Sequence, residues 1–370
     1  MSRETILYMG GFQLPDKNAA ALRVLANAKA LRELGHEVIF VHSLPDTSLP
    51  SMQMTSYSGF DCYEYKRENQ FAYLTQCRRV ISIIKERNVT AVIAYNYPAI
   101  ALNRLRKYCQ RNKIRCYADV TEWYVASGNP AFRVIKNFDT AFRMKHVHFK
   151  LDGIMAISEY LYRYYAPKQK AVKIPPLVDL RDEKWTSEDA PVPDCLSLIY
   201  AGSPSAQKER LDLLVKAVDK VAREIPITLK IVGLTREQYC RMYGYDELGE
   251  EVVFFGVVSN REVISMLKRS DWSVIIRDKN KVVQAGFPTK VSESISCGVP
   301  VIANRFSNVA DYLDETNSIL FDDMEALESS IRQAFQKKTA PDRTRFDYHR
   351  YLGEFDVLFS QRLERGERHG

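Results

Sequence analysis

Apolar residues along the chain fall into short runs and helical stripes that alternate with one another. Residues 6–9 form an apolar run, and the next one, 38–41, lies in a predicted strand at 37–41. Between them, apolar side chains recur at intervals of three and four over 18–34, as on one face of a helix. Gly35 follows, where a helix C-terminus favours a left-handed residue. A strand, a helix and a second strand in this order indicate the start of a parallel sheet.

The same alternation continues through both halves of the chain. In the first half it predicts helices at 74–87 and 100–112, strands at 91–94, 114–118 and 152–157, and Ser158 as the N-cap of a helix from Glu159. In the second half it predicts a helix at 211–224 and strands at 196–200, 227–232, 252–255, 273–276 and 299–303. We interpret the polar, acidic and proline-bearing segment 180–194 as a linker. The expected fold is α/β, with Rossmann-like domains at 1–179 and 195–345 and a final helix at 346–370.

Length and composition agree with two soluble globular domains. The chain has 370 residues, 46% hydrophobic and 27% charged, too many residues for one ordinary core. No apolar run approaches the roughly 18 residues of a membrane-spanning helix. The N-terminus leads directly into the first strand, so we expect no signal peptide. The seven cysteines form no Cys-x-x-Cys pair, and we expect reduced thiols in a cytoplasmic protein with no metal site.

The charge is unevenly distributed. Residues 1–178 carry 26 Lys and Arg against 14 Asp and Glu, whereas 179–370 carry 27 against 32. The basic half therefore predicts an anionic partner for the first domain alone. We expect no nucleic acid as partner, because no helix-turn-helix, zinc-finger or RNP signature accompanies the charge. An anionic membrane surface or a pyrophosphate-linked acceptor fits better.

The stretch from Gly286 to Val301 (GFPTKVSESISCGVPV) carries the most chemistry. Pro288 suits the start of a helix, and the free N–H groups at such a start bind anions. Thr289 adds a hydroxyl and Lys290 a cation, which together fit a diphosphate. Glu293 lies one turn further on, where its carboxylate can accept hydrogen bonds from the hydroxyls of a ribose. The alternative is an ordinary helix on which Lys290 and Glu293 form a surface pair.

This string resembles the nucleotide-sugar site of glycosyltransferase family 4, whose members have the GT-B fold. A second element of the resemblance is Gly202, Ser203 and Lys208 after the strand 196–200. The family commonly has Arg where this chain has Ser203, and Arg277 is a further candidate for holding phosphate. A solvated loop lysine remains the alternative for Lys208. The resemblance implies donor contacts by Gly11, Gly202, Ser203, Lys208, Arg277, Gly286, Phe287, Pro288, Thr289, Lys290 and Glu293.

The first domain contributes weaker signals. Gly10-Gly11 resembles the family's glycine turn after the first strand and does not fit a Gly-x-Gly-x-x-Gly dinucleotide motif. Asp119 and Glu122 follow the strand 114–118, at the sheet edge where α/β proteins bind ligands. They are our candidates for positioning the acceptor or taking its proton, and a structural role for Asp119 is an equally good account. Relatives often have a His here, and this chain has none. It also has Ala285 where many members have a Glu that touches the donor sugar.

The resemblance implies two domains that face each other across a cleft, with the C-terminal helix crossing back to the first. It also implies a retaining, metal-independent transferase without a cofactor, which moves a sugar from a nucleoside diphosphate, UDP foremost, to a glycan or lipid-linked glycan in surface polysaccharide synthesis. Lys208 and Lys290 would stabilise the leaving diphosphate. The phenylalanines and basic residues of 131–150 suit either a membrane interface or packing on the domain's own sheet. A catalytically inactive nucleotide-binding scaffold and a nucleotide-sugar epimerase are the competing hypotheses.

Overall fold

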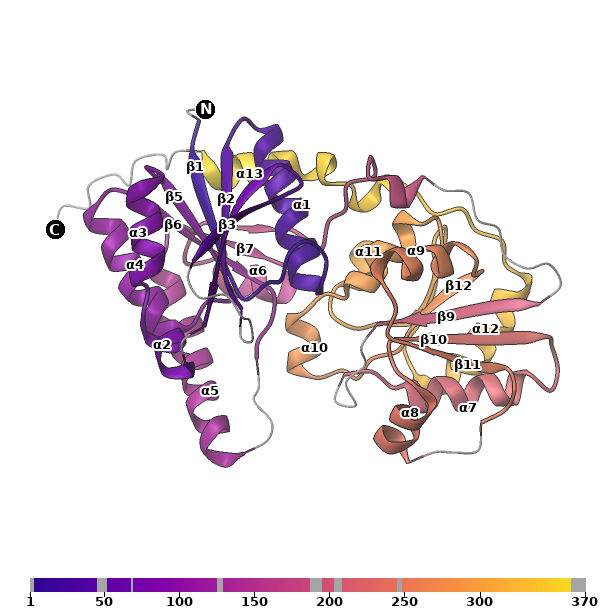
Figure 1. The fold of residues 1–370 in the computed structure, drawn as a ribbon. Coiled ribbons are helices and arrows are strands. Elements are labelled where there is room, and N and C mark those ends of the chain that lie inside the picture. The colour runs from indigo at the N-terminus through magenta and orange to yellow at the C-terminus, as the bar shows by residue number, and fades with distance from the viewer. Residues whose placement is uncertain are drawn as a thin grey trace. The chain divides into compact units, whose positions relative to one another are not determined.

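The structure, a computed structural model, describes residues 3–44, 52–67, 69–124, 129–186, 195–202, 208–244 and 248–360. The chain divides into two compact units, whose helices and strands Figure 1 labels and colours by residue number. The first unit runs to Ile174 and takes up the chain again from Tyr348, and the second unit is Pro175–Asp347. Among the described helices, none is both long enough and apolar enough to cross a membrane.

The first unit contains an eight-stranded sheet in the order β3-β4-β2-β1-β5-β6-β7-β8. Neighbouring strands are parallel except β3 and β4, an antiparallel edge hairpin whose turn residues Ser58 and Gly59 both have positive φ. The central strands are covered on both faces, which explains their nearly continuous apolar sequences. The strands are β1 Thr5–Gly10, β2 Glu37–Leu44, β3 Gln53–Tyr57, β4 Phe60–Lys66, β5 Ala91–Tyr95, β6 Arg115–Val120, β7 Gly153–Ala156 and β8 Ala171–Lys173. The helices are α1 Ala19–Glu33, α2 Gln70–Thr75, α3 Arg78–Glu86, α4 Ala99–Arg111, α5 Pro130–Phe142, α6 Glu159–Tyr165 and α13 Leu352–Phe359.

The second unit repeats this plan with six parallel strands in the order β11-β10-β9-β12-β13-β14. Its core lies between the sheet and helices α7 and α12, where Leu214, Leu229 and Trp272 are buried together. The strands are β9 Leu196–Ala201, β10 Ile227–Val232, β11 Val252–Gly256, β12 Trp272–Ile275, β13 Val301–Asn304 and β14 Ser318–Phe321. The helices are α7 Leu211–Val221, α8 Arg236–Tyr243, α9 Asn260–Lys268, α10 Lys281–Ala285, α11 Thr289–Ser296 and α12 Leu327–Gln336. Two parallel-sheet units confirm the α/β fold prediction.

The predicted linker 180–194 is wrong in its first part. Glu183–Trp185 form a 3-10 turn in the second unit, and Trp185 is only 2% exposed in a cluster with Ile199 and Leu267. This burial fixes the segment despite its polar composition, because one large aromatic side chain anchors it. The rest of the predicted linker, 187–194, lies outside the described residues.

The C-terminal segment returns to the first unit, as the resemblance implied. The helix α13 packs against β7, β8 and α1. The Phe359 ring lies 4.7 Å from that of Tyr117, and the Phe359 carbonyl accepts a 2.7 Å hydrogen bond from Arg115. The helix itself is shorter than predicted, since Tyr348–Tyr351 form a 3-10 turn before it. Residues after 360 lie outside the described part.

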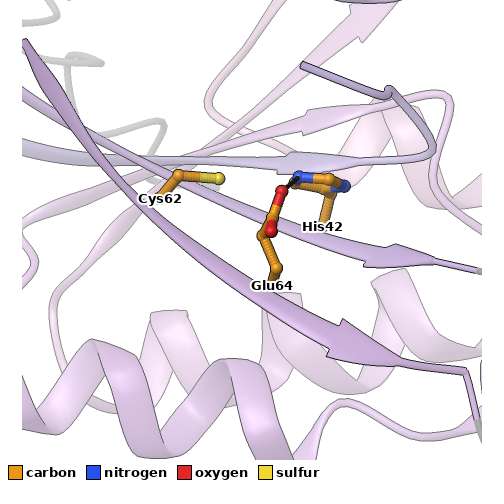
Figure 2. Close-up of side chains that lie close together, drawn as sticks. All are labelled: His42, Cys62 and Glu64. Carbon is orange, nitrogen blue, oxygen red and sulfur yellow. Dashed lines mark hydrogen bonds and ion pairs between the residues drawn. The ribbon is translucent and has the colours of Figure 1, made fainter. Parts of the chain in front are cut away.

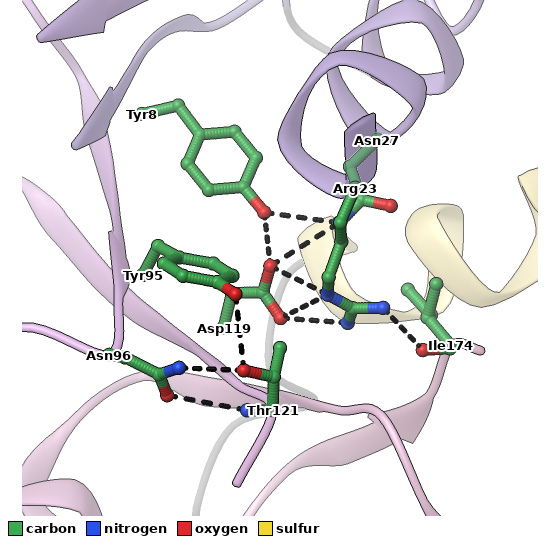
Figure 3. A network of polar contacts seen from close by, with 8 residues as sticks. All are labelled: Tyr8, Arg23, Asn27, Tyr95, Asn96, Asp119, Thr121 and Ile174. Atoms are coloured by element: carbon green, nitrogen blue, oxygen red, sulfur yellow. Dashed lines mark hydrogen bonds and ion pairs between the residues drawn. The ribbon is translucent and has the colours of Figure 1, made fainter. Parts of the chain in front are cut away.

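A buried ion pair joins distant elements of the first unit (Figure 3). Arg23 of α1 donates from Nε and Nη2 to the carboxylate of Asp119 in β6, at 2.7–3.0 Å, and from Nη1 to the carbonyl of Ile174 at 2.9 Å. The Tyr8 hydroxyl of β1 donates to the same carboxylate at 2.5 Å and accepts from Asn27 at 3.0 Å. Burial raises the pKa of Tyr8 well above its usual range, so this hydroxyl remains a donor. The network fixes α1 against the carboxyl ends of β1 and β6.

We expect Arg23→Ala to lower the free energy of unfolding by about 3–5 kcal/mol, because it leaves the Asp119 carboxylate buried without its counter-ion. Urea denaturation measures the change. The matched control is Arg163→Ala, which removes an exposed pair with Glu159 and should cost about 0–1 kcal/mol. Equal small effects of the two substitutions would contradict a structural role for this ion pair.

Candidate functional site

A helix begins in the second unit where the sequence predicts one. The helix α11 begins at Thr289, and its N-cap residue Pro288 has an extended backbone. Pro288 therefore precedes the first turn, one position earlier than the sequence suggested. Within the described residues no side chain caps the helix, so the backbone N–H groups of Thr289 and Lys290 and the positive end of the helix dipole face toward the N-terminus of the helix, where an anion would be stabilised.

The turn before this helix is held in place from behind. Ser307, which has a φ of +47°, donates from its hydroxyl to the carbonyls of Gly286 at 2.7 Å and Gln284 at 3.1 Å. The buried Phe287 ring packs edge-on against Tyr312, with centroids 5.2 Å apart. Gly286 and Phe287 thus position the helix start, and the side chain of Phe287 is in the core rather than at a ligand.

Lys290 extends from the first turn of α11 to the end of β9. Its Nζ donates to the Tyr200 hydroxyl at 2.7 Å and lies 3.4 Å from Oε1 of Glu209. The lysine side chain passes over Gly202, where a Cβ would collide with its Cε. Gly202 also has a φ of +142°, so both the space and the backbone require glycine there. The sequence motifs at Gly202 and Lys290, nearly ninety positions apart in the chain, therefore meet in one place.

Sequence reasoning missed Glu209, which organises the cations of this site. Its carboxylate is 3% exposed, and Oε1 accepts a hydrogen bond from Nη2 of Arg277 at 2.7 Å besides its contact with Lys290. Arg277 is fixed in turn by Asn304, whose Oδ1 accepts from the arginine backbone N–H at 2.9 Å. The one signal in the sequence was the position of Glu209 directly after Lys208. One carboxylate between two cations leaves the cluster with a net charge of +1.

Burial disfavours the charged form of Lys290. It lowers the pKa of this lysine to about 8, while the nearby Glu209 carboxylate opposes the shift. The side chain is 12% exposed. An anion placed beside Nζ would stabilise the ammonium form and raise its pKa again. The cluster is positively charged and largely shielded from solvent. Together with the N–H groups at the start of α11, it favours binding of a multiply charged anion.

Glu293 follows one turn after Lys290 and is half-buried. Its Oε1 accepts a weak, 3.5 Å hydrogen bond from Asn260, which also accepts one from Lys184 at 2.9 Å. Burial raises the pKa of the Glu293 carboxyl, and the charge of Lys184 acts in the opposite direction. A carboxylate held this loosely can accept hydrogen bonds from a pair of ligand hydroxyls.

The other residues predicted to contact the donor have fewer contacts that indicate a role. Lys208 is half-buried, and its carbonyl accepts a 3.1 Å hydrogen bond from the backbone N–H of Asp278. Ser203 lies outside the described residues. In the first unit, Gly10 rather than Gly11 is the glycine that the fold requires: a Cβ on Gly10 would lie 2.6 Å from the Tyr95 carbonyl oxygen, whereas Gly11 has ordinary space.

The hypothesis that Asp119 positions an acceptor or takes its proton is not supported. The residue is fully buried, and its two carboxylate oxygens accept hydrogen bonds from Arg23 and Tyr8. The structural alternative therefore holds for Asp119. Glu122, just beyond the end of β6, is half-buried and stays a candidate.

Among the described residues, His42, Cys62 and Glu64 form a group whose potential metal-ligand atoms lie within 4.8 Å of one another (Figure 2). They lie side by side because β2 and β4 pair with His42 opposite Glu64. The Glu64 carboxylate is engaged by His42 at 3.0 Å and Tyr57 at 2.9 Å, and burial raises the pKa of the Cys62 thiol. Three ligands are one short of a structural zinc site, and hydrogen bonding within the sheet accounts for the contacts.

Comparisons with known proteins bear on the family and the fold. Residues 196–337, which include all of the described candidates in the second unit, match the family described as Glycosyl transferases group 1. No curated protein sequence matches the chain. Among solved structures, sucrose-phosphate synthase from Thermosynechococcus elongatus has a TM-score of 0.71 at 15% identity, over 96% of this chain and 98% of that one. The apo lipopolysaccharide outer core galactosyltransferase WaaB gives 0.63 at 14%, over 96% and 99%.

A third solved structure, Anabaena HepE in complex with UDP and glucose, has a TM-score of 0.57 at 12% identity and covers 96% of both chains. At these identities the likeness establishes the fold, which is GT-B, with two parallel-sheet domains. What the site does has to be argued from its own residues.

We expect the Lys290 ammonium to titrate near pH 8 in the unliganded protein, and Glu209→Gln to lower its pKa further because a favourable charge is lost. Since the unfolded pKa is about 10.4, the folded protein loses this proton first, and Lys290 makes stability rise between about pH 8 and 10.4. Lysine-selective NMR measures the titration, with Lys290→Met identifying the resonance. A Lys290 pKa unchanged by Glu209→Gln would contradict the electrostatic role of this carboxylate.

Proposed function

We propose that this protein is a retaining glycosyltransferase of the family 4 type, which transfers a hexose-like sugar from a nucleoside diphosphate, UDP in the first instance, to a glycan or lipid-linked glycan. The observation that carries the proposal is the cationic cluster of Lys290 and Arg277 around Glu209 at the uncapped start of α11. A diphosphate is opposite in charge to this cluster, and Glu293 lies one turn further along the helix for the ribose hydroxyls.

The chemistry follows from where the positive charge lies. As the bond between the sugar C1 and the β-phosphate oxygen breaks, negative charge grows on the leaving diphosphate. Lys290, Arg277, Lys208 and the N–H groups of α11 supply positive charge fixed before the reaction begins, which is the most effective form of transition-state stabilisation. In the proposed step the acceptor hydroxyl oxygen bonds to C1 on the face that the diphosphate leaves. Its proton passes to a phosphate oxygen of the leaving group, so no separate protein base is required. The proposal involves no metal ion.

The acceptor side is proposed on the family resemblance and on the charge of the first unit. The structural neighbours include an outer core galactosyltransferase and a protein solved with UDP and glucose, which supports surface polysaccharide synthesis as the setting. Glu122 is the remaining candidate in the first unit for orienting an acceptor hydroxyl.

The exposed side chains of helix α5 favour contact with an anionic membrane. Its apolar residues Val134, Ile135 and Phe138 are 70%, 55% and 65% exposed, and Figure 1 shows the helix extending away from the sheet of the first unit. The C-terminal end is anchored, since Asp139 accepts a hydrogen bond from the Ala99 N–H at the start of α4. Exposed Arg133 and Lys145 on the same segment complement anionic lipid. We propose that the protein works at the inner face of the cell membrane, with these side chains in the lipid interface.

We expect Lys290→Ala and Glu293→Ala each to reduce sugar transfer by a factor of roughly 10²–10³, the usual effect of removing one stabilising group. Donor turnover with UDP-sugars, measured by mass spectrometry, tests this, and thermal melting confirms that the fold survives. Lys216→Ala, an exposed residue of α7, is the control. Binding of UDP without turnover by the wild type would favour the scaffold hypothesis instead.

For the membrane contact, we expect Val134→Ser combined with Phe138→Ser to weaken binding to vesicles that contain anionic lipid. The control is Val357→Ser, because this valine is 55% exposed on α13 of the same unit. Co-sedimentation measures binding, which should also fall as salt screens the basic residues. Unchanged binding of the double variant would exclude α5 as the contact.

A further inference from the structure

A cavity of about 440 Å³ lies in the first unit, apart from the cluster around Lys290. It opens where β2, β4 and β5 end, at the edge of the sheet where α/β proteins bind their ligands. Its described lining includes three arginines and three tyrosines: Arg67, Arg78, Arg79, Tyr65, Tyr73 and Tyr97. No carboxylate is among the lining residues that the structure describes. The cavity is therefore strongly positive.

The side chain of Arg67 has an unusual environment in this cavity. Its guanidinium lies over the Tyr73 ring, 3.8 Å from the centroid. Its Nε is buried and has no hydrogen-bond partner within the described part of the chain. A buried guanidinium N–H without an acceptor is unfavourable, so an anion that enters the cavity would gain a hydrogen bond from this donor.

The other walls of the cavity suit a phosphorylated sugar. Arg79 donates to the Lys66 carbonyl at 3.2 Å and lies against the Tyr65 ring at 5.0 Å, which fixes its guanidinium beside the end of β4. The helix α3 begins at Arg78 without a side-chain cap, so its N–H groups add to the positive field. Tyr73 and Tyr97 pack edge to face, 6.1 Å apart, and aromatic walls of this kind suit the apolar face of a sugar ring.

The cavity also adjoins the glycine turn of the first strand. The Tyr73 hydroxyl is the nearest group to the position that a Cβ on Gly11 would take, at 3.4 Å. Burial raises the pKa of Tyr73 and of Tyr97, so both hydroxyls remain neutral donors. A ligand in the cavity therefore lies close to the Gly10-Gly11 turn, where the family resemblance places the donor phosphate.

From this geometry we infer that the cavity binds the phosphate of the acceptor, so that the acceptor is a sugar phosphate or a sugar linked through a diphosphate. Arg67 and Arg79 would hold phosphate oxygens, for which the guanidinium fork is well suited, and the tyrosines would contact the sugar. The inference rests on the proposed transferase function and adds the chemical class of the acceptor. The same phosphate chemistry is found in a soluble sugar phosphate and in a polyprenyl-diphosphate-linked sugar, and the experiment separates the two.

The test uses the full-length protein and two probes, a hexose 6-phosphate in solution and a polyprenyl-diphosphate-linked hexose in detergent micelles. Calorimetric titration should show binding of at least one probe and none of an unphosphorylated hexose. Arg67→Gln and Arg79→Gln should each weaken that binding roughly tenfold or more. Lys85→Gln is the control, since it removes an exposed charge at the other end of α3 and should have no effect.

UDP affinity, measured on the same variants, separates this inference from the proposed function. We expect Arg67→Gln and Arg79→Gln to leave UDP binding unchanged, and Lys290→Ala to weaken UDP binding while sparing the phosphate probe. Binding of the soluble probe alone or of the lipid-linked probe alone identifies the source of the phosphate. The inference is overturned if the wild type binds UDP but neither probe, or if the arginine variants, shown by thermal melting to be folded, bind the probe as tightly as the wild type.

Discussion

The candidate site depends on one buried carboxylate that is shared by two cations. Glu209 holds Arg277 at 2.7 Å and lies 3.4 Å from Lys290, which keeps both cations at the end of β9 before any ligand arrives. Without this carboxylate, two positive groups in a poorly hydrated place would repel each other or lose a proton. With it, the cluster still carries a charge of +1 and faces an uncapped helix start, so the electrostatic requirement for an anion is built into the fold.

Buried charge is neutralised at one place in the structure and left in excess at others. In the first unit Asp119 is neutralised by Arg23 and bonded to Tyr8, so this ion pair is complete and stabilises the packing of α1 on the sheet. In the second unit the cations outnumber the carboxylate, and the pKa of Lys290 falls to about 8 in consequence of its burial. The complete pair accounts for its own charge, whereas the incomplete one leaves positive charge that an anionic ligand would neutralise. The arginine-lined cavity beside Tyr73 belongs to the second kind, since it gathers positive charge around the unbonded Nε of Arg67.

Much of the fold was predictable, and the errors have local causes. The helix predicted at 74–87 is two helices, because Gln76 adopts an extended backbone after α2. Apolar spacing continues across this break and conceals it. The hairpin of β3 and β4 escaped prediction, since its edge strand β3 is largely exposed and carries little apolar pattern. The charged residues of 180–186 predicted a linker. Burial of one side chain, Trp185, instead fixes this segment in the second unit.

The sequence alone determined the alternation of strands and helices, and with it the two parallel sheets. It also determined the string from Pro288 to Glu293, because a helix start, a cation and a carboxylate one turn apart are local features of the chain. Only the tertiary structure decided which charged residues meet. Asp119 lies within β6 and Glu209 between β9 and α7, and nothing local to either acid shows which residue it contacts. The first contacts Arg23 from a helix 96 residues earlier, and the second contacts Lys290 from a helix 81 residues later. The role of a buried charge depends on its partners, and those partners are brought together by the packing of the sheets.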